Sequence, residues 1–257
     1  MVSPWCIRML MSCRIRTGSL PGPGNVRDTF SRCMIVSTSF RILLLSFALC
    51  CLSLSHASAR ETNVILLFGD SLIAGYGLPE EDSVPTKLEV LLKKQLGDAR
   101  VINGGVSGDT TAGGRSRLEW TLNRNRPRLV VLALGGNDVL RGIPYEVTRD
   151  NLAAMLNLLK QRNIPTILSE VRAPDSHGKI YGEKLGEVYK GLAKTYGIPL
   201  YPFLLTEVFG NSEMMQIDGI HPNAKGAELI ALKLSDYILA PDYISVWKSK
   251  QIHDTPR

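Results

Sequence analysis

After residue 60 the sequence alternates short apolar runs with longer amphipathic segments, and this alternation constrains the fold more than any other feature. The apolar runs are short enough for strands and lie at 64–68, 101–102, 129–134, 166–168 and 198–201. Helical segments are indicated at 84–96, 110–123, 145–162, 182–196 and 224–239. Strands that alternate with helices form right-handed βαβ units around a parallel sheet. The pattern predicts one α/β domain over residues 60–257, with a three-layer α/β/α architecture.

Local features support these assignments. Val64–Phe68 is apolar without interruption, as expected for a strand that is covered on both faces. Asp109 is the expected N-cap of the helix at 110–123, and Pro222 lies near the first turn of the last helix. We expect a flavodoxin-like, five-stranded parallel sheet with the common strand order 2-1-3-4-5.

Residues 1–59 have the features of an export leader. Ile42–Leu54 is mostly apolar, follows Arg41, and precedes the Ala-Ser-Ala of residues 57–59, which is the small-x-small pattern of a signal-peptidase site. This run falls short of the ~20 residues that span a bilayer, and a retained interfacial anchor is the alternative. A signal peptide of ordinary form would begin at Met34, which is a candidate for the true start. We predict a bacterial protein that is periplasmic or secreted and has no stable membrane anchor once the leader is removed.

Charge and cysteine content change at the same boundary. The leader carries six arginines and a single acid, Asp28, whereas residues 60–257 carry 24 basic and 23 acidic side chains. Most of the net charge of +6 therefore belongs to the leader, and we predict no nucleic-acid partner. All five cysteines precede residue 52, so the remainder of the chain can form neither a disulfide nor a thiolate metal site.

Four polar clusters follow predicted strands, at the edge where open α/β sheets bind ligands. They are Gly69–Leu72, Asn103–Thr110, Gly135–Asp138 and Asp218–Asn223. In the first cluster, Ser71 occupies a strand-to-helix turn, where a hydroxyl is exposed and backbone N–H groups can stabilise an anion. The alternative for this serine is an ordinary helix N-cap.

The second and third clusters supply candidate hydrogen-bond donors. The glycines of the second cluster allow close backbone approach, so that the N–H of Gly108 can point into a cleft. The side-chain amide of Asn137 is a neutral donor that suits an oxyanion hole. The alternatives are a plain βα turn with an Asp cap around Gly108 and common turn chemistry at Asn137.

The fourth cluster presents a carboxylate and an imidazole from one short loop. Asp218 precedes His221 by three residues, and Pro222 disfavours helical geometry at His221. After the leader the other histidines are His177, in a polar loop, and His253, in the tail, which makes His221 the leading candidate for a general base. The alternative is a surface Asp–His pair at the start of a helix.

In the predicted strand order, the strand at 64–68 lies between the strands at 101–102 and 129–134. Ser71, Gly108 and Asn137 then converge on one point and provide a nucleophile with hydrogen-bond donors around it, as acyl transfer requires.

The four clusters resemble the four sequence blocks of the SGNH (GDSL-type) hydrolases, in order and at similar spacing, over roughly residues 63–239. Within the family the chain is most similar to the periplasmic thioesterase, lysophospholipase and arylesterase group. The resemblance implies a catalytic triad of Ser71, Asp218 and His221. It also implies an oxyanion hole formed by the N–H groups of Ser71 and Gly108 and by the Asn137 amide.

Sequence features of other enzyme classes are absent. The chain contains no Gly-x-Ser-x-Gly elbow, no Gly-Lys-Ser/Thr phosphate loop and no His-Glu-x-x-His zinc helix. We predict no cofactor and no metal ion, and a small acyl ester or thioester as the substrate. Two rivals remain, namely a carbohydrate O-deacetylase with a polar, shallow cleft and a non-catalytic envelope binding protein.

Two loops are expected to border the acyl site, at 139–144 and 172–180. In the first loop Leu140 and Ile143 are candidate contacts for an acyl chain, with ordinary surface packing as the alternative.

Overall fold

The computed structural model describes residues 63–244, and the predicted leader with its alternative start lies outside them. The sheet consists of β1 (Asn63–Gly69), β2 (Ala99–Gly105), β3 (Leu129–Ala133), β4 (Thr166–Ser169) and β5 (Leu200–Tyr201). All neighbouring strands are parallel, and their order is β2-β1-β3-β4-β5. The predicted strand order is confirmed.

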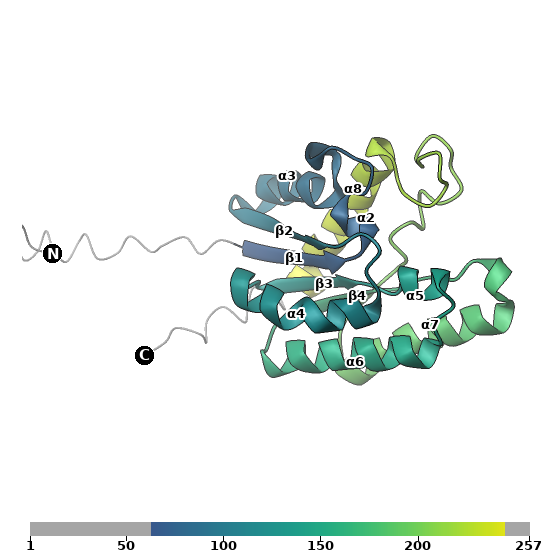
Figure 1. The fold of residues 1–257 in the computed structure, drawn as a ribbon. Helices are drawn as coiled ribbons and strands as arrows, with labels where there is room; N and C mark the ends of the chain where they lie inside the picture. The colour runs from purple at the N-terminus through teal and green to yellow at the C-terminus, as the bar shows by residue number, and fades with distance from the viewer. Residues whose placement is uncertain (1–62, 245–257) are drawn as a thin grey trace, which may run out of the picture. The chain divides into compact units, whose positions relative to one another are not determined.

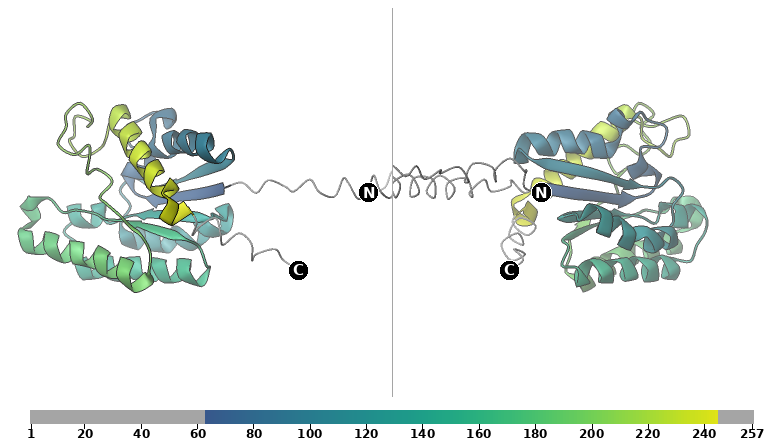
Figure 2. Two further views of the ribbon diagram at one scale, coloured as in Figure 1. Left: turned by 180° about the vertical axis from the view of Figure 1, so that it is seen from behind. Right: turned by 60° about the vertical axis from the view of Figure 1, so that its left-hand side comes forward.

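Helices cover both faces of the sheet (Figures 1 and 2). α3 (Val84–Leu96) and α8 (Ala224–Leu239) pack together on one face. On the other face, α6 (Tyr145–Gln161) packs between α4 (Thr111–Asn125) and α7 (Lys179–Tyr196). The short elements are α2 (Ser71–Ala74), α5 (Gly136–Leu140), η2 (Glu80–Asp82) and η3 (Asp175–His177). The result is the predicted three-layer α/β/α arrangement.

β1 explains why a continuous apolar run is needed in the centre of this fold. Successive strand side chains point to opposite faces, so Ile65 and Leu67 join the core beneath α3 and α8. Leu66 and Phe68 join the core beneath α4, α6 and α7. All four side chains are fully buried, and each such burial contributes about 1.5–3 kcal/mol to stability. This packing fixes the end of β1, from which the first polar cluster emerges.

Most of the predicted elements differ from the observed ones by a few residues at one end or the other. α4 begins at Thr111, and its N-cap is Thr110, whose Oγ1 accepts a hydrogen bond from the Gly113 N–H. The prediction of Asp109 as the cap is wrong, because its carboxylate pairs with Arg117, eight residues further along the chain. β2 is longer than expected, because its polar end remains in register with β1 as far as Gly105. α7 begins three residues early, at Lys179.

Candidate active site

Ser71 is the first residue of α2, directly after β1 at the carboxyl edge of the sheet. The Asp70 carboxylate caps this helix by accepting a hydrogen bond from the Leu72 N–H at 3.1 Å. α2 ends after four residues at Gly75, which has a left-handed φ of 78°. At Gly105 a Cβ atom would lie only 2.1 Å from the backbone nitrogen of Ala74, so α2 packs directly on the end of β2. This close contact fixes the turn that presents the Ser71 hydroxyl.

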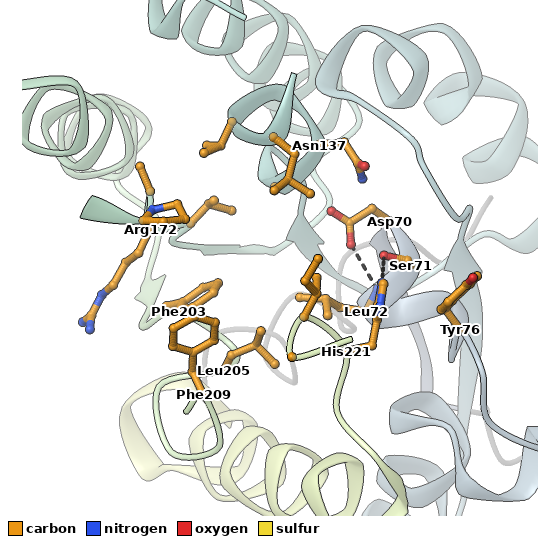
Figure 3. Close-up of a pocket in the computed structure, with 18 of the residues that line it drawn as sticks. Asp70, Ser71, Leu72, Tyr76, Asn137, Arg172, Phe203, Leu205, Phe209 and His221 are labelled. Atoms are coloured by element: carbon orange, nitrogen blue, oxygen red, sulfur yellow. Dashed lines mark hydrogen bonds between the residues drawn. The ribbon is translucent and has the colours of Figure 1, made fainter. Parts of the chain in front are cut away.

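The structure brings the three predicted catalytic side chains into one hydrogen-bonded chain. His221 Nε2 lies 2.8 Å from Ser71 Oγ, and His221 Nδ1 lies 2.6 Å from Asp218 Oδ2. Figure 3 marks the hydrogen bond between Ser71 and His221, which both line a cavity. These distances allow proton transfer from the serine to the imidazole and orientation of the imidazole by the carboxylate.

The carboxylate of Asp218 is held by its own loop. Its Oδ1 accepts hydrogen bonds from the N–H groups of His221 and Ile220, at 3.0 and 2.9 Å. The hydrogen bonds from the His221 backbone, the His221 ring and the Ile220 backbone lower the pKa of Asp218 to about 2. Asp218 is therefore ionised throughout the neutral pH range, as a group that must orient an imidazole requires.

Contacts with a distant segment hold the loop that carries His221. The Gln216 side-chain amide donates to the carbonyl of Tyr76 at 2.7 Å and to that of Pro222 at 2.9 Å. The Tyr76 ring also lies against the His221 ring, with 4.6 Å between the centroids. The base is thus fixed relative to the segment that follows the nucleophile turn.

Gly108 and Asn137 line the same cavity as Ser71. Gly108 adopts a left-handed φ of 78°, which glycine reaches without the strain of a side chain. The next residue after Asn137, Asp138, is fully buried and accepts hydrogen bonds from both the backbone N–H and the hydroxyl of Thr111. This buried link joins the Asn137 turn to the start of α4, which follows the Gly108 turn.

The cavity has a volume of about 700 Å³, and much of its wall is apolar. Apolar side chains come from α2, from α5 and from the segments that follow β4 and β5 (Leu72, Val139, Leu140, Val171, Ala173, Phe203, Leu205, Phe209, Ile220). In Figure 3, Phe203, Leu205 and Phe209 lie together, farther along the cavity from Ser71 than His221 does.

The two predicted acyl contacts have different outcomes. Leu140 lines the cavity, and more than half of its surface is exposed. Ile143 is not part of the cavity wall, and its carbonyl accepts a hydrogen bond from the Tyr181 hydroxyl at 2.9 Å. No sequence pattern pointed to Phe203 and Phe209, although their position after the last strand places them at the same edge of the sheet.

Asp70 is a buried acid within this site, with 5% of its surface exposed. Loss of hydration on burial raises the pKa of Asp70 to about 6, against the lowering effects of the Leu72 N–H and of His221. Since the folded state binds this proton more tightly than the unfolded chain, Asp70 favours folding below pH 4. That contribution is lost as the pH rises through about 6.

Replacement of Asp70 by Asn should therefore stabilise the protein at pH 8 and have little effect near pH 4. An Asn side chain retains the cap on Leu72 and removes the cost of burying a charge, which amounts to up to about 3 kcal/mol for a shift of two pKa units. Urea unfolding of wild type and variant at both pH values measures the difference. An equal difference at pH 4 and pH 8 would show that Asp70 does not titrate in this range.

Two features are absent from residues 63–244. Within this range no three His, Cys, Asp or Glu side chains gather as a metal site. None of the helices found there combines the length and apolar character needed to cross a bilayer.

Comparisons with known proteins agree on one family. The model of the GDSL-like lipase/acylhydrolase family matches residues 67–229. An arylesterase from Vibrio mimicus is 37% identical over 202 residues, which span 77% of this chain and 99% of the relative. The thioesterase 1/protease 1/lysophospholipase L1 of Escherichia coli K12 is 38% identical over 176 residues, spanning 68% and 82% of the two chains.

Solved structures give the same result. AlinE4, an SGNH-hydrolase family esterase, is 42% identical with a TM-score of 0.60, and the match covers 70% of this chain and 97% of that one. The psychrotrophic esterase EstA from Pseudoalteromonas sp. is 32% identical with a TM-score of 0.65, over 73% and 99% of the two chains. The fold and these relatives define a serine ester hydrolase. The chain belongs to the GDSL-like lipase/acylhydrolase family, the SGNH hydrolases, and the resemblance seen in the four sequence blocks is confirmed.

Proposed function

We propose that this enzyme cleaves acyl esters and thioesters through an acyl-enzyme on Ser71. The observation that carries the proposal is the hydrogen-bonded chain from Ser71 through His221 to Asp218, which opens into a largely apolar cavity. His221 takes the proton of the Ser71 hydroxyl as its oxygen attacks the acyl carbonyl, and later returns a proton to the leaving group. Asp218 holds the ring tautomer and stabilises the imidazolium.

The negative charge that develops on the carbonyl oxygen needs donors already in place. Ser71 N–H, Gly108 N–H and the Asn137 amide are the donors that we assign, since all three residues line the cavity. Water then attacks the acyl-enzyme, with His221 as the base, and releases the acid. No cofactor is needed for any of these steps.

The cavity wall favours an acyl chain as the part of the substrate that is recognised. Apolar side chains from four segments surround the space beyond Ser71, and burial of each methylene of an acyl chain contributes about 0.8 kcal/mol. The names of the relatives, an arylesterase and a thioesterase/lysophospholipase, fit such substrates. A carbohydrate O-deacetylase, the rival considered from the sequence, would need a more polar wall.

We also propose that residues 1–59 direct export, so that a single domain at 60–257 acts in the periplasm or outside the cell. The arrangement of Arg41, the apolar run and the Ala-Ser-Ala of residues 57–59 supports this proposal. Sequencing the N-terminus of the protein recovered from a periplasmic fraction tests it, and an N-terminus within residues 58–62 is the expected result.

The substrate proposal is tested with p-nitrophenyl acetate, butyrate and decanoate, using the wild type and Phe209→Ala. Removal of this ring should lower kcat/KM for decanoate and leave acetate hydrolysis nearly unchanged, since acetate is too short to reach it. Leu232→Ala, which removes an exposed apolar side chain on α8, is the matched control. An equal loss on all three esters would exclude Phe209 from the acyl site, and the absence of turnover by folded wild type would contradict the proposed function.

Asn137→Ala tests the oxyanion hole. Loss of one donor should lower kcat by about 10²–10³ with little change in KM, because the charge appears only in the transition state. Steady-state kinetics on p-nitrophenyl butyrate measure the effect. A variant with wild-type kcat would remove Asn137 from the proposed set of donors.

A further inference from the structure

Arg117 lies on α4, outside the proposed catalytic set, and makes an unusual set of contacts. Its Nε donates to Asp109 Oδ2 at 2.7 Å. Its Nη1 and Nη2 donate to the carbonyls of Gly104 and Gly69, both at 2.9 Å. The guanidinium lies 3.9 Å from the centroid of the Phe68 ring, and 22% of the side chain is exposed. One side chain thus uses three nitrogen atoms and a stacking face on four different partners.

The acceptors of Arg117 belong to the two turns that build the site. Gly69 ends β1 and precedes Ser71 by two residues. Gly104 lies near the end of β2, and Asp109 directly follows Gly108. The guanidinium therefore connects the end of the nucleophile strand with both sides of the Gly108 turn. Gly69 O also accepts the N–H of Val106 at 3.1 Å, which closes the link between these two segments.

The chemistry of these contacts requires an arginine. The guanidinium is planar and always charged, and its N–H groups point in fixed directions, so partners bound to it keep a fixed separation. A lysine ammonium is a single point on a flexible stem and cannot hold three acceptors in this arrangement.

We propose that Arg117 is a positioning residue for the reaction at Ser71, because it sets the separation between the Ser71 turn and the Gly108 turn. The tetrahedral intermediate needs its carbon at Ser71 Oγ and its oxygen at the Gly108 N–H at the same time. A small change in the separation of the two turns therefore acts on the transition state. This inference rests on the proposed function and adds to it a residue that does not touch the substrate.

The proposal predicts that loss of Arg117 changes kcat far more than KM. The apolar wall that we assign to substrate binding comes from α2, α5 and the segments after β4 and β5, and Arg117 hydrogen-bonds to none of its residues. Loosening the two turns should consequently slow the chemical steps and leave binding of the acyl chain largely unchanged.

The test compares Arg117→Lys with wild type in the full chain, on p-nitrophenyl butyrate and in the rate of labelling by a fluorophosphonate. The variant keeps the positive charge but loses the planar guanidinium, whose N–H groups hold the three acceptors in place. We expect kcat and the labelling rate to fall by about 10²-fold, the usual effect of a misplacement near 1 Å, with KM changed less than about threefold. Asp109→Asn, which leaves the bonds to both carbonyls intact, should show a smaller loss in the same direction.

Two controls separate positioning from stability. Leu118→Ala creates a cavity beneath the same helix and lowers Tm without touching either turn. Arg162→Lys alters another arginine that holds two side chains of α4, Asn123 and Glu119, far along the helix from the site. Both controls should retain wild-type kcat at temperatures well below their Tm.

The outcomes distinguish this inference from the function on which it rests. If Arg117→Lys keeps kcat within about threefold of wild type, or if Leu118→Ala loses as much at a matched Tm, the positioning role is wrong and the proposed function stands. If folded wild type neither turns over the ester nor reacts with the fluorophosphonate, both are wrong. Partial recovery of an Arg117→Ala variant by added guanidinium, and not by sodium chloride at equal ionic strength, would further support the role.

Discussion

Replacement of Ser71 by Ala should lower kcat for p-nitrophenyl butyrate by about 10⁶ and leave Tm nearly unchanged. The variant removes the oxygen that forms the acyl-enzyme, and the residual rate comes from water in a site that still binds the ester and holds its donors. The hydroxyl is only half-buried and its hydrogen-bond partner is the His221 ring, so its loss does not leave a buried polar group unsatisfied. Steady-state assays at equal concentrations of purified wild type and variant measure the ratio.

The matched control is Ser116→Ala, which removes an exposed hydroxyl on α4 that bonds only within its own helix turn. That variant should keep wild-type kinetics. A Ser71→Ala enzyme that retained more than a tenth of wild-type kcat would require a different nucleophile.

The parts of this molecule that follow from local patterns were predictable. The side chains of Val64–Phe68 point alternately into the cores on the two faces of the sheet. A strand that is buried on both faces is apolar at every position. The hydrogen bond between His221 and Asp218 spans three residues, so that one turn with Gly219 at a φ of 65° suffices to form it. The approach of His221 to Ser71 needs the whole sheet, and it was expected from the resemblance to the SGNH hydrolases and not from a local pattern.

The features that the sequence did not reveal depend on contacts between distant segments. Asp109 has the residue type and position of a helix cap, yet its carboxylate faces Arg117, whose other nitrogens bond to carbonyls at the ends of β1 and β2. Phe203 and Phe209 lie in a long irregular segment without periodicity, where only the finished fold shows which side chains face the cavity. Ile143 is the converse case, since it follows Leu140 closely in the sequence but lies outside the cavity wall.

The orientation of the base has the same dependence on distant contacts. Gln216 and Tyr76 are 140 residues apart, and their hydrogen bond holds the His221 loop against the segment after the nucleophile. On the side of the ring away from Ser71, Asp218 Oδ2 faces His221 Nδ1. This one oxygen determines which nitrogen of His221 carries the proton. A substitution that changes only this atom should therefore leave the imidazole in place and change its tautomer.

Asp218→Asn is that substitution, and it should lower kcat by about 10⁴ with no more than a small change in Tm. The Asn oxygen can still accept the N–H groups of Ile220 and His221, so the loop keeps its shape. The Asn amino group replaces the oxygen that faces His221 Nδ1, and as a donor it favours the tautomer that carries its proton on Nε2. In that tautomer His221 cannot accept the proton of Ser71.

The measurement is kcat together with the rate of fluorophosphonate labelling, beside Asp236→Asn, which alters an exposed acid on α8. Both rates should fall in Asp218→Asn and stay at the wild-type level in the control. The pKa of Asp218, lowered to about 2, means that the wild-type carboxylate stays ionised from neutral pH down to about pH 3. The ratio of variant to wild-type activity should accordingly stay small at every pH where the enzyme is folded and active. If the variant kept more than a tenth of wild-type kcat, Asp218 would be a structural support of the loop, and the imidazole would be oriented by another group.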